Sequence, residues 1–228
     1  PFSKTIIEIG PGPGASTRSI LSNGGKNVFV IEKDQDSIKM LDPLKKSFPS
    51  ELNVIKADAL KYPLWNLGSY PRQIIANLPY NISTKILVKL LKNINKFEKI
   101  TLMFQKEVAL RLVAKPSQKL YGRLSVLTQL LANTKIIFDI PRSAFIPKPK
   151  VNSSVVKIVP LKNNPNKFKF EDIEKITQLT FSRRRKMLRT IFKNYGGINM
   201  LNETDISPNL RPENLTIEEY CKLAKKIF

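Results

Sequence analysis

The chain has 228 residues, which is enough for one large domain or for a large domain with a small companion. Its composition, 42% hydrophobic and 25% charged, is typical of a globular protein, and no apolar run approaches the length of a membrane span. The sequence contains no His and a single Cys, Cys221, so it excludes a catalytic histidine, an internal disulfide and a Cys/His zinc site. We expect no metal site and a reducing, cytoplasmic environment.

The formal net charge is +21, from 39 Lys and Arg residues against 18 Asp and Glu residues. An excess of this size predicts a polyanionic partner, above all a nucleic acid. Richness in Lys together with Asn and Ile is also what an AT-rich genome encodes, so the charge needs the support of motifs. The chain starts with Pro1 and shows no signal-peptide pattern, and we expect its true N-terminus to be missing.

Short, apolar, β-branched runs alternate with helical stretches as far as Pro160. The runs are 5–10, 27–32, 53–58, 73–78, 100–104, 136–140 and 153–159. Buried strands that alternate with helices, two of them over 83–94 and 106–114, predict the α/β class, a doubly wound, mostly parallel sheet of seven strands. The connection between the last two runs is too short for a helical crossover, so these strands should form an antiparallel hairpin at the sheet edge.

A change of composition follows Pro160, where residues 161–170 are polar and have the pattern of a linker. Beyond it only helices are predicted, a long one over 171–196 and another over 216–228. We therefore predict two domains, a cofactor-binding domain over 1–160 and a small all-helical domain over 161–228.

Glycine or polar residues follow the first four predicted strands. Gly10 and Gly12 come after the first, in a loop where the backbone can approach a ligand closely, and Glu32, Asp58 and Asn77 end the next three. Open α/β sheets bind ligands at the carboxyl ends of their strands, so these ends predict one nucleoside-sized crevice, with the ribose hydroxyls on Glu32. Each residue alone is explained as well by a turn or a cap, and the glycine spacing does not indicate a pyrophosphate site.

Eight stretches, read in order, resemble the motifs of one family. EIGPGPG, VIEKD, KADAL and NLPYNIST are similar to motifs of Rossmann-like S-adenosylmethionine-dependent methyltransferases, and Asn-Leu-Pro-Tyr resembles the motif of those that methylate exocyclic amines of nucleobases. FQKEVALRLVA, YGRLSVLTQ, AFIPKPKVNSSVVKIVP and TFSRRRKMLRTIF resemble ribosomal RNA adenine dimethyltransferases, specifically the bacterial small-subunit dimethyladenosine transferases whose loss gives kasugamycin resistance. The match covers nearly the whole chain.

The resemblance implies S-adenosylmethionine as cofactor, with Gly10, Glu32, Asp58 and Asn77 on the family's cofactor contacts. It also implies N6,N6-dimethylation of two adjacent adenosines in the 3′-terminal hairpin of 16S ribosomal RNA, within an immature 30S subunit. We expect a monomer that acts in the cytoplasm. Members of the family carry an N-terminal Gly-Gln-Asn-Phe-Leu-like motif that helps to close over the cofactor, and this sequence starts after it.

The catalytic candidates are Asn77, Leu78, Pro79 and Tyr80. An adenine N6 amine is a poor nucleophile until it pyramidalises, and the Asn77 side-chain oxygen with the Leu78 carbonyl would accept its two N–H groups in that geometry. Pro79 fixes the backbone, and the Tyr80 ring offers a face for stacking the base. Phe145 resembles the family's second aromatic residue and would close the other side. Core packing is the alternative for both rings.

The basic sequence between 183 and 189 is the strongest candidate for RNA binding. We expect its residues on one face of the long helix, where they would contact phosphates: Arg183, Arg184, Arg185, Lys186 and Arg189. A solvated charged face is the alternative.

Three other functions compete with the small-subunit methyltransferase. A large-subunit (23S) adenine methyltransferase that confers macrolide resistance shares the cofactor motifs, and the basic second domain argues against it. The protein could instead act mainly as a non-catalytic 30S assembly factor. A nicotinamide oxidoreductase is disfavoured by the glycine spacing and by the lack of His.

Overall fold

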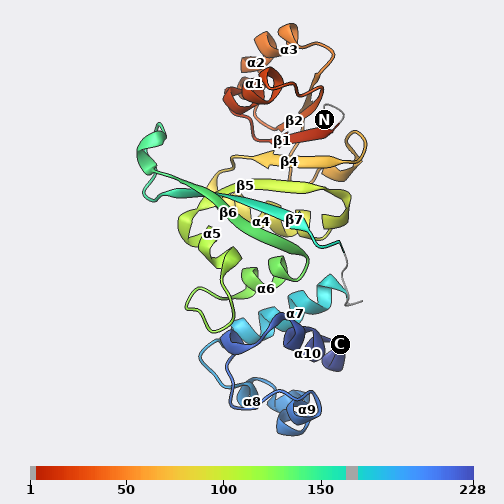
Figure 1. The fold of residues 1–228 in the computed structure, drawn as a ribbon, viewed down its shortest axis with the longest axis vertical. Helices are drawn as coiled ribbons and strands as arrows, with labels where there is room; N and C mark the ends of the chain where they lie inside the picture. The colour runs from red at the N-terminus through yellow and green to blue at the C-terminus, as the bar shows by residue number, and fades with distance from the viewer. Residues whose placement is uncertain (1–3, 163–168) are drawn as a thin grey trace. The chain divides into compact units, whose positions relative to one another are not determined.

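The computed structural model describes residues 4–162 and 169–228. In these ranges the chain forms a seven-stranded sheet, in the order β3-β2-β1-β4-β5-β7-β6 (Figure 1). The strands are β1 (Thr5–Ile9), β2 (Asn27–Glu32), β3 (Leu52–Lys56), β4 (Arg72–Ala76), β5 (Lys99–Gln105), β6 (Ala132–Ile140) and β7 (Ser153–Pro160). The described α-helices are α1 (Ala15–Ser22), α2 (Gln35–Met40), α3 (Asp42–Ser47), α4 (Tyr80–Leu91), α5 (Lys106–Val113), α6 (Arg123–Gln129), α7 (Phe170–Phe181), α8 (Leu188–Ile191), α9 (Gly197–Glu203) and α10 (Ile217–Ile227).

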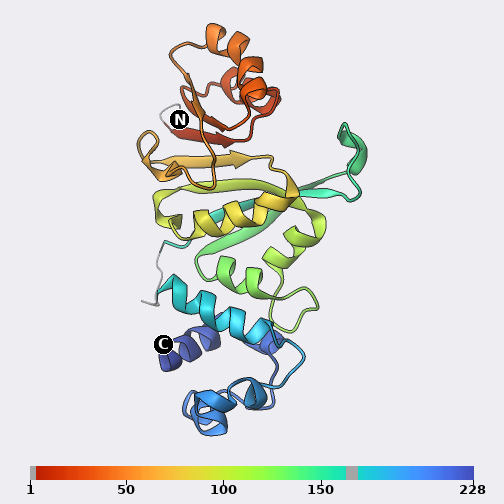
Figure 2. The same cartoon turned by 180° about the vertical axis from the view of Figure 1, so that it is seen from behind.

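The sheet confirms the predicted fold class. All seven predicted strands are present, and β1, β2, β3, β4 and β5 pair in parallel while β7 runs antiparallel to β5. As predicted, β6 and β7 are neighbours at one edge of the sheet, and in both views their connection projects away from it (Figures 1 and 2). Helix α4 packs against β5 and is seen in front of the sheet in Figure 2.

Apolar side chains explain why these elements pack. In the first part of the chain, α2 and α3 lie against β2 and β3 over a buried cluster. Its members are Leu21, Val28, Val30, Leu41, Leu44 and Leu52. Within the described ranges, no helix is both long and apolar enough to cross a membrane.

The chain divides into two compact units, and the division differs from the predicted boundary in one segment. The first unit is Pro1–Ala109 with Lys135–Pro160, and the second is Leu110–Thr134 with Leu161–Phe228. Helix α6 thus belongs with the C-terminal helices, because it packs against α7 and α10 and because the buried Tyr121 hydroxyl donates a 2.9 Å hydrogen bond to the Leu215 carbonyl. Of the predicted linker over 161–170, residues 163–168 lie outside the described residues.

The prediction of one long helix over 171–196 is wrong. Helix α7 ends at Phe181, a turn follows, and α8 begins only at Leu188. The N–H of Leu188 donates to the Leu210 carbonyl at 2.8 Å and that of Arg189 to the Pro208 carbonyl at 3.0 Å, so backbone elsewhere in this unit replaces the helical partners. The predicted C-terminal helix is confirmed as α10, with a capping box at Thr216.

Arg184 fixes the turn that interrupts the helix. Its guanidinium donates to the Glu213 carboxylate at 2.6 Å and to the Lys119 carbonyl at 2.7 Å. A charge-assisted bond combined with a backbone bond ties the turn to two other segments of the same unit.

We predict that Arg184→Met lowers the free energy of unfolding by about 1 to 2 kcal/mol, because it removes both bonds from a partly exposed site. Urea denaturation followed by far-UV circular dichroism measures the change. Arg183→Met is the matched control, since Arg183 is exposed in the same turn, and it should shift stability by less than about 0.5 kcal/mol. Equal effects of the two substitutions would show that the Glu213 pair does not hold the turn.

Candidate active site

Four parallel strands end side by side at one edge of the sheet. The register pairs Ile9 of β1 with Ile31 of β2 and with Ala76 of β4, so Gly10, Glu32 and Asn77 follow one another across the sheet. The Gly10 N–H donates to the Ile31 carbonyl at 3.0 Å, and the Ala57 N–H donates to the Glu32 carbonyl at 2.9 Å. With strands about 4.8 Å apart, the four ends span about 14 Å. The predicted row of residues is therefore assembled by the sheet.

The two glycines predicted for the cofactor differ in their surroundings. Gly10 has φ +65°, and a Cβ there would lie 3.3 Å from Leu78 Cδ2, so this glycine lets the loop pack on the Asn-Leu-Pro-Tyr segment. Gly12 has φ +54°, and a Cβ there would meet nothing within 4 Å. Backbone conformation alone favours glycine at 12, and space beside it is open to a ligand.

Glu8 is a residue of the site that the sequence analysis missed. It lies in β1 with 1% of its surface exposed, and its carboxylate accepts hydrogen bonds from the hydroxyls of Ser16 and Thr17, the latter at 2.5 Å. Burial raises the pKa of the Glu8 carboxyl above its ordinary value, and the two hydroxyls oppose that rise. Glu8 thereby ties the start of α1 to β1 and closes the glycine loop. The signal was an acid within an otherwise apolar strand, TIIEI.

The carboxylates of Glu32 and Asp58 each have one oxygen occupied. Glu32 Oε1 accepts from the N–H groups of Lys33 at 2.7 Å and Asp34 at 2.9 Å. Asp58 Oδ1 accepts from the Leu60 N–H at 2.8 Å. Among the described residues, the second oxygen of each carboxylate has no hydrogen-bond partner, so each side chain is oriented by the backbone and keeps one acceptor for a ligand.

A cavity of about 230 Å³ lies beside Asn77. It is lined by Asn77, Leu78, Pro79, Tyr80, Met103, Phe145, Pro147 and Pro149. The structure thus brings the predicted tetrapeptide together with Phe145, which comes from the β6–β7 connection. The Tyr80 hydroxyl is 2.7 Å from Ser153 Oγ, and this bond fixes the ring at the wall of the cavity.

The residues of the tetrapeptide differ in their burial and in the hydrogen bonds of their oxygens. Asn77 is exposed, and its side chain has no hydrogen-bond partner in the described part of the chain, whereas Leu78 is buried. The Pro79 carbonyl accepts from Ile82 and Ser83 in the first turn of α4, at 3.1 and 3.2 Å. No backbone hydrogen bond to the Leu78 carbonyl is formed within the described ranges. Asn77 Oδ1 and the Leu78 carbonyl are therefore the acceptors left for a bound group.

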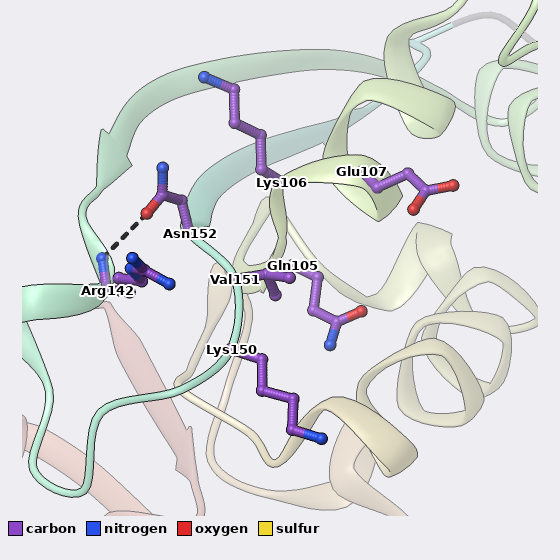
Figure 3. A pocket seen from close by; sticks show the side chains of 7 residues that line it. All are labelled: Gln105, Lys106, Glu107, Arg142, Lys150, Val151 and Asn152. Atoms are coloured by element: carbon purple, nitrogen blue, oxygen red, sulfur yellow. Dashed lines mark hydrogen bonds between the residues drawn. The ribbon is translucent and has the colours of Figure 1, made fainter.

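A second cavity, of about 480 Å³, lies on the same face of β5 as the first. Gln105 lines it, two residues after Met103 of the first cavity, and two residues of a strand are about 7 Å apart. In Figure 3 the side chains of Gln105 and Lys150 point to the same side, while those of Lys106 and Glu107 point elsewhere. Lys106 pairs with Asp139 at 2.5 Å. Arg142 and Lys150 form no ion pair within the described ranges, which makes this cavity attractive to an anion.

The residues predicted to bind RNA lie in the second compact unit. Four of them lie on the turn between α7 and α8 instead of on one long helix, and Arg189 lies in α8. Four of the five are exposed: Arg183, Arg185, Lys186 and Arg189. Arg184 differs because it pairs with Glu213. The turn lines a cavity of about 500 Å³ together with Phe181, Ser182 and Thr190. Among the described residues, no group of three or more acidic, Cys or His side chains could hold a metal ion.

A mostly parallel seven-stranded sheet, with a glycine loop after β1 and Asn-Leu-Pro-Tyr after β4, defines a Rossmann-like methyltransferase. Solved structures agree. A dimethyladenosine transferase from Plasmodium falciparum is similar with a TM-score of 0.83 and 28% identity, over 98% of this chain and 92% of that one. The 23S rRNA methyltransferase ErmE has a TM-score of 0.71 at 21% identity, over 99% and 91%, and shares the fold.

The model of the ribosomal RNA adenine dimethylase family matches residues 3–228, and the chain belongs to that family. It is thus an rRNA adenine dimethyltransferase. Two relatives are named ribosomal RNA small subunit methyltransferase A. The protein of Paramagnetospirillum magneticum is 42% identical over 98% of this chain and 80% of its own length. That of Wolbachia sp. subsp. Drosophila simulans is 46% identical over 97% and 82%.

We predict that Glu8→Gln changes the pH dependence of stability. The folded-state pKa of Glu8 lies above its ordinary value of 4.5, so the unfolded chain loses this proton first, and the wild-type free energy of unfolding falls as the pH rises from 4.5 through the folded-state pKa. Gln keeps contacts to both hydroxyls without titrating. Urea denaturation between pH 4 and 8 should therefore show that the free energy of unfolding of the variant increases relative to that of the wild type as the pH rises.

Glu98→Gln is the control for Glu8. A hydrogen bond from Lys4 lowers the pKa of Glu98, so its contribution is present above 4.5 and lost as the pH falls through the folded-state pKa. With the titration extended down to about pH 3, the free energy of unfolding of the wild type should rise relative to that of this variant as the pH rises to 4.5, the reverse of the trend for Glu8→Gln. The same trend for both would contradict the assignment of a raised pKa to Glu8.

Proposed function

We propose that the protein uses S-adenosylmethionine to dimethylate N6 of two adjacent adenosines in the 3′-terminal hairpin of 16S ribosomal RNA. The single observation that carries the proposal is the cavity that joins Asn77 and Tyr80 to Phe145. Relatives named as small-subunit methyltransferases are 42% and 46% identical, whereas ErmE is 21% identical, which favours 16S over 23S RNA. We further propose that the substrate is an immature 30S subunit and that the protein acts as a monomer in the cytoplasm.

The residues at the strand ends fit the cofactor. Gly12 leaves open space where a Cβ would project, and Glu32 and Asp58 each keep one acceptor oxygen. Glu32 would take a ribose hydroxyl, and Gly10, Gly12 and Asp58 would hold the rest of the nucleoside, with Asn77 next to its reactive end. When bound, S-adenosylmethionine supplies an electrophilic methyl group.

Asn77 and Leu78 would prepare the adenine amine. Their two oxygens accept its two N–H groups, which orients the nitrogen lone pair and favours the tetrahedral geometry of attack. Pro79 holds the Leu78 carbonyl in place because its φ is fixed and because its own carbonyl is engaged by α4. No strong base is needed, since the methylated amine carries a positive charge and loses its proton readily to water. The lack of His is therefore consistent with this chemistry.

Tyr80 and Phe145 would hold the base between their rings. Stacking on an aromatic face contributes about 1 to 3 kcal/mol per base. A base held in this way has left its own stack, as in other enzymes that modify nucleobases. The exposed cations of the two units would contact the RNA backbone: Arg142, Lys150, Arg183, Arg185, Lys186 and Arg189. Arg184, which the sequence also suggested for this role, instead supports the turn that carries its neighbours.

We predict that Asn77→Ala lowers the rate of 16S methylation by about 100-fold or more, because it removes one of two acceptors for the amine. Transfer of labelled methyl groups from S-adenosylmethionine to immature 30S particles measures the rate. Asn81→Ala is the matched control, since Asn81 is exposed in the first turn of α4. In parallel assays with 23S RNA, label in 23S RNA but none in the 16S RNA of the 30S particles would overturn the choice of substrate. Full assembly activity of Asn77→Ala without methylation would favour an assembly factor.

We predict that Lys150→Ala weakens binding to the 30S particle and reduces the slope of log affinity against log salt concentration by about 1, since one phosphate contact is lost. Filter binding at several KCl concentrations measures both. Lys46→Ala, an exposed lysine of α3, should leave the slope unchanged. An unchanged slope for Lys150→Ala would show that the RNA does not contact the second cavity through Lys150.

A further inference from the structure

Lys89 of α4 makes contacts that a surface lysine does not make. Its ammonium donates to the Ala59 carbonyl at 2.7 Å and to the Tyr62 carbonyl at 2.5 Å, and it lies over the Trp65 ring, 5.6 Å from the centroid. Two of the three N–H donors of the ammonium are therefore bound to backbone carbonyls, and its charge lies over an aromatic face. Lys89 therefore binds the segment that follows β3.

Because the Lys89 ammonium is half-buried, its charged form would be unfavourable without hydrogen-bond acceptors. Desolvation lowers the pKa of Lys89, and the negative charge of Asp58 partly opposes that decrease. A half-buried cation persists where its hydrogen bonds are made, and a carbonyl turned inward needs a donor as well. One ammonium meets both needs for two carbonyls at once, which a neutral side chain with a single donor cannot do.

The segment that Lys89 holds is the turn that presents Asp58. The N–H groups of Lys61 and Tyr62 both donate to the Asp58 carbonyl at 2.9 Å, and that of Leu60 donates to Asp58 Oδ1 at 2.8 Å. These bonds fix Asp58 within the turn, but they do not attach the turn to the rest of the unit. Lys89 attaches the turn to α4 through the carbonyls of Ala59 and Tyr62.

Helix α4 carries Lys89 and the target-base residue Tyr80 together. Tyr80 is its first residue, and Lys89 follows two and a half turns later, about 14 Å along the axis. One rigid helix thus sets the wall of the base cavity at its start and the position of the Asp58 turn near its end. The two halves of the site are connected by a single element of secondary structure.

We propose that Lys89 is a positioning residue for the cofactor: its ammonium group holds the 58–62 turn so that the free oxygen of Asp58 meets the bound nucleoside. This inference rests on the proposed function, because it takes Asp58 as a cofactor contact. Lys89 itself does not touch the reacting atoms. Its loss should therefore weaken cofactor binding and leave the chemical step intact once the cofactor is bound.

The test is Lys89→Met, which keeps an unbranched side chain of similar length, one atom shorter, and removes its donors. We expect the Kd for S-adenosylhomocysteine, measured by titration calorimetry, and the KM for S-adenosylmethionine to rise about tenfold to 100-fold, as expected when charge-assisted hydrogen bonds are lost. The kcat on immature 30S particles should change less than about threefold. Lys89→Arg, which retains several donors, should recover most of the affinity. Lys85→Met, at an exposed position of the same helix, should bind as the wild type does.

A double-mutant cycle with Asp58→Asn separates positioning from general destabilisation. If Lys89 acts through Asp58, the effect of Lys89→Met on the Kd should shrink to less than about threefold in the Asp58→Asn background. The inference would be overturned if Lys89→Met raised the Kd as much in the Asp58→Asn background as in the wild type. It would also be overturned if Lys89→Met bound with wild-type affinity. A wild-type protein that binds no S-adenosylhomocysteine would instead contradict the proposed function. If Lys89→Met does not fold, Lys89→Arg and Lys89→Gln are compared in the same cycle.

Discussion

The register of four parallel strands is the constraint on which the rest of the site depends. Since β3, β2, β1 and β4 end at one edge, Glu32, Gly10 and Asn77 lie in one row, and Asp58 follows β3 beside Glu32. The hydrogen bonds from Gly10 to Ile31 and from Ala57 to Glu32 continue the ladder one residue past the strands. A shift of one residue in any pair would turn its polar end toward the wrong face. The apolar strands therefore determine where the polar groups lie.

Much of this arrangement follows from local patterns in the sequence. Buried strands read as short apolar runs, and the residue that ends each run is visible in the sequence, so the sheet, the strand-end row and the hairpin at its edge were predictable. The interrupted helix after Phe181 was not, because its break depends on bonds of Arg184 to Glu213 and Lys119, which are distant in sequence. The grouping of residues 110–134 with the C-terminal helices depends likewise on Tyr121 and Leu215. Hydrogen bonds between residues that are distant in sequence produce no periodic pattern in the sequence.

Two titratable groups, the buried Glu8 and the half-buried Lys89, hold neighbouring segments in position. Glu8 receives two hydroxyl bonds and fixes the start of α1, while Lys89 gives two bonds to carbonyls and fixes the turn after β3. For both, burial disfavours the charged form, as the raised pKa of Glu8 and the lowered pKa of Lys89 show. An ionised group with several fixed partners is more restrictive than an apolar one, because only one geometry satisfies all its bonds. Each therefore restricts a loop at the strand ends more than packing alone would.

The Asn-Leu-Pro-Tyr segment serves packing and function in the same four residues. The buried Leu78 meets Gly10, so the loop after β1 and the loop after β4 are set against each other, and Asn77 beside it remains exposed with an unoccupied amide. The Pro79 carbonyl starts α4, and Tyr80 is held by Ser153. Because the proposed chemistry needs two neutral acceptors at fixed places and no base, its demands fall on backbone geometry. A tetrapeptide in which Leu78, Pro79 and Tyr80 are anchored while the Asn77 side chain stays free meets those demands.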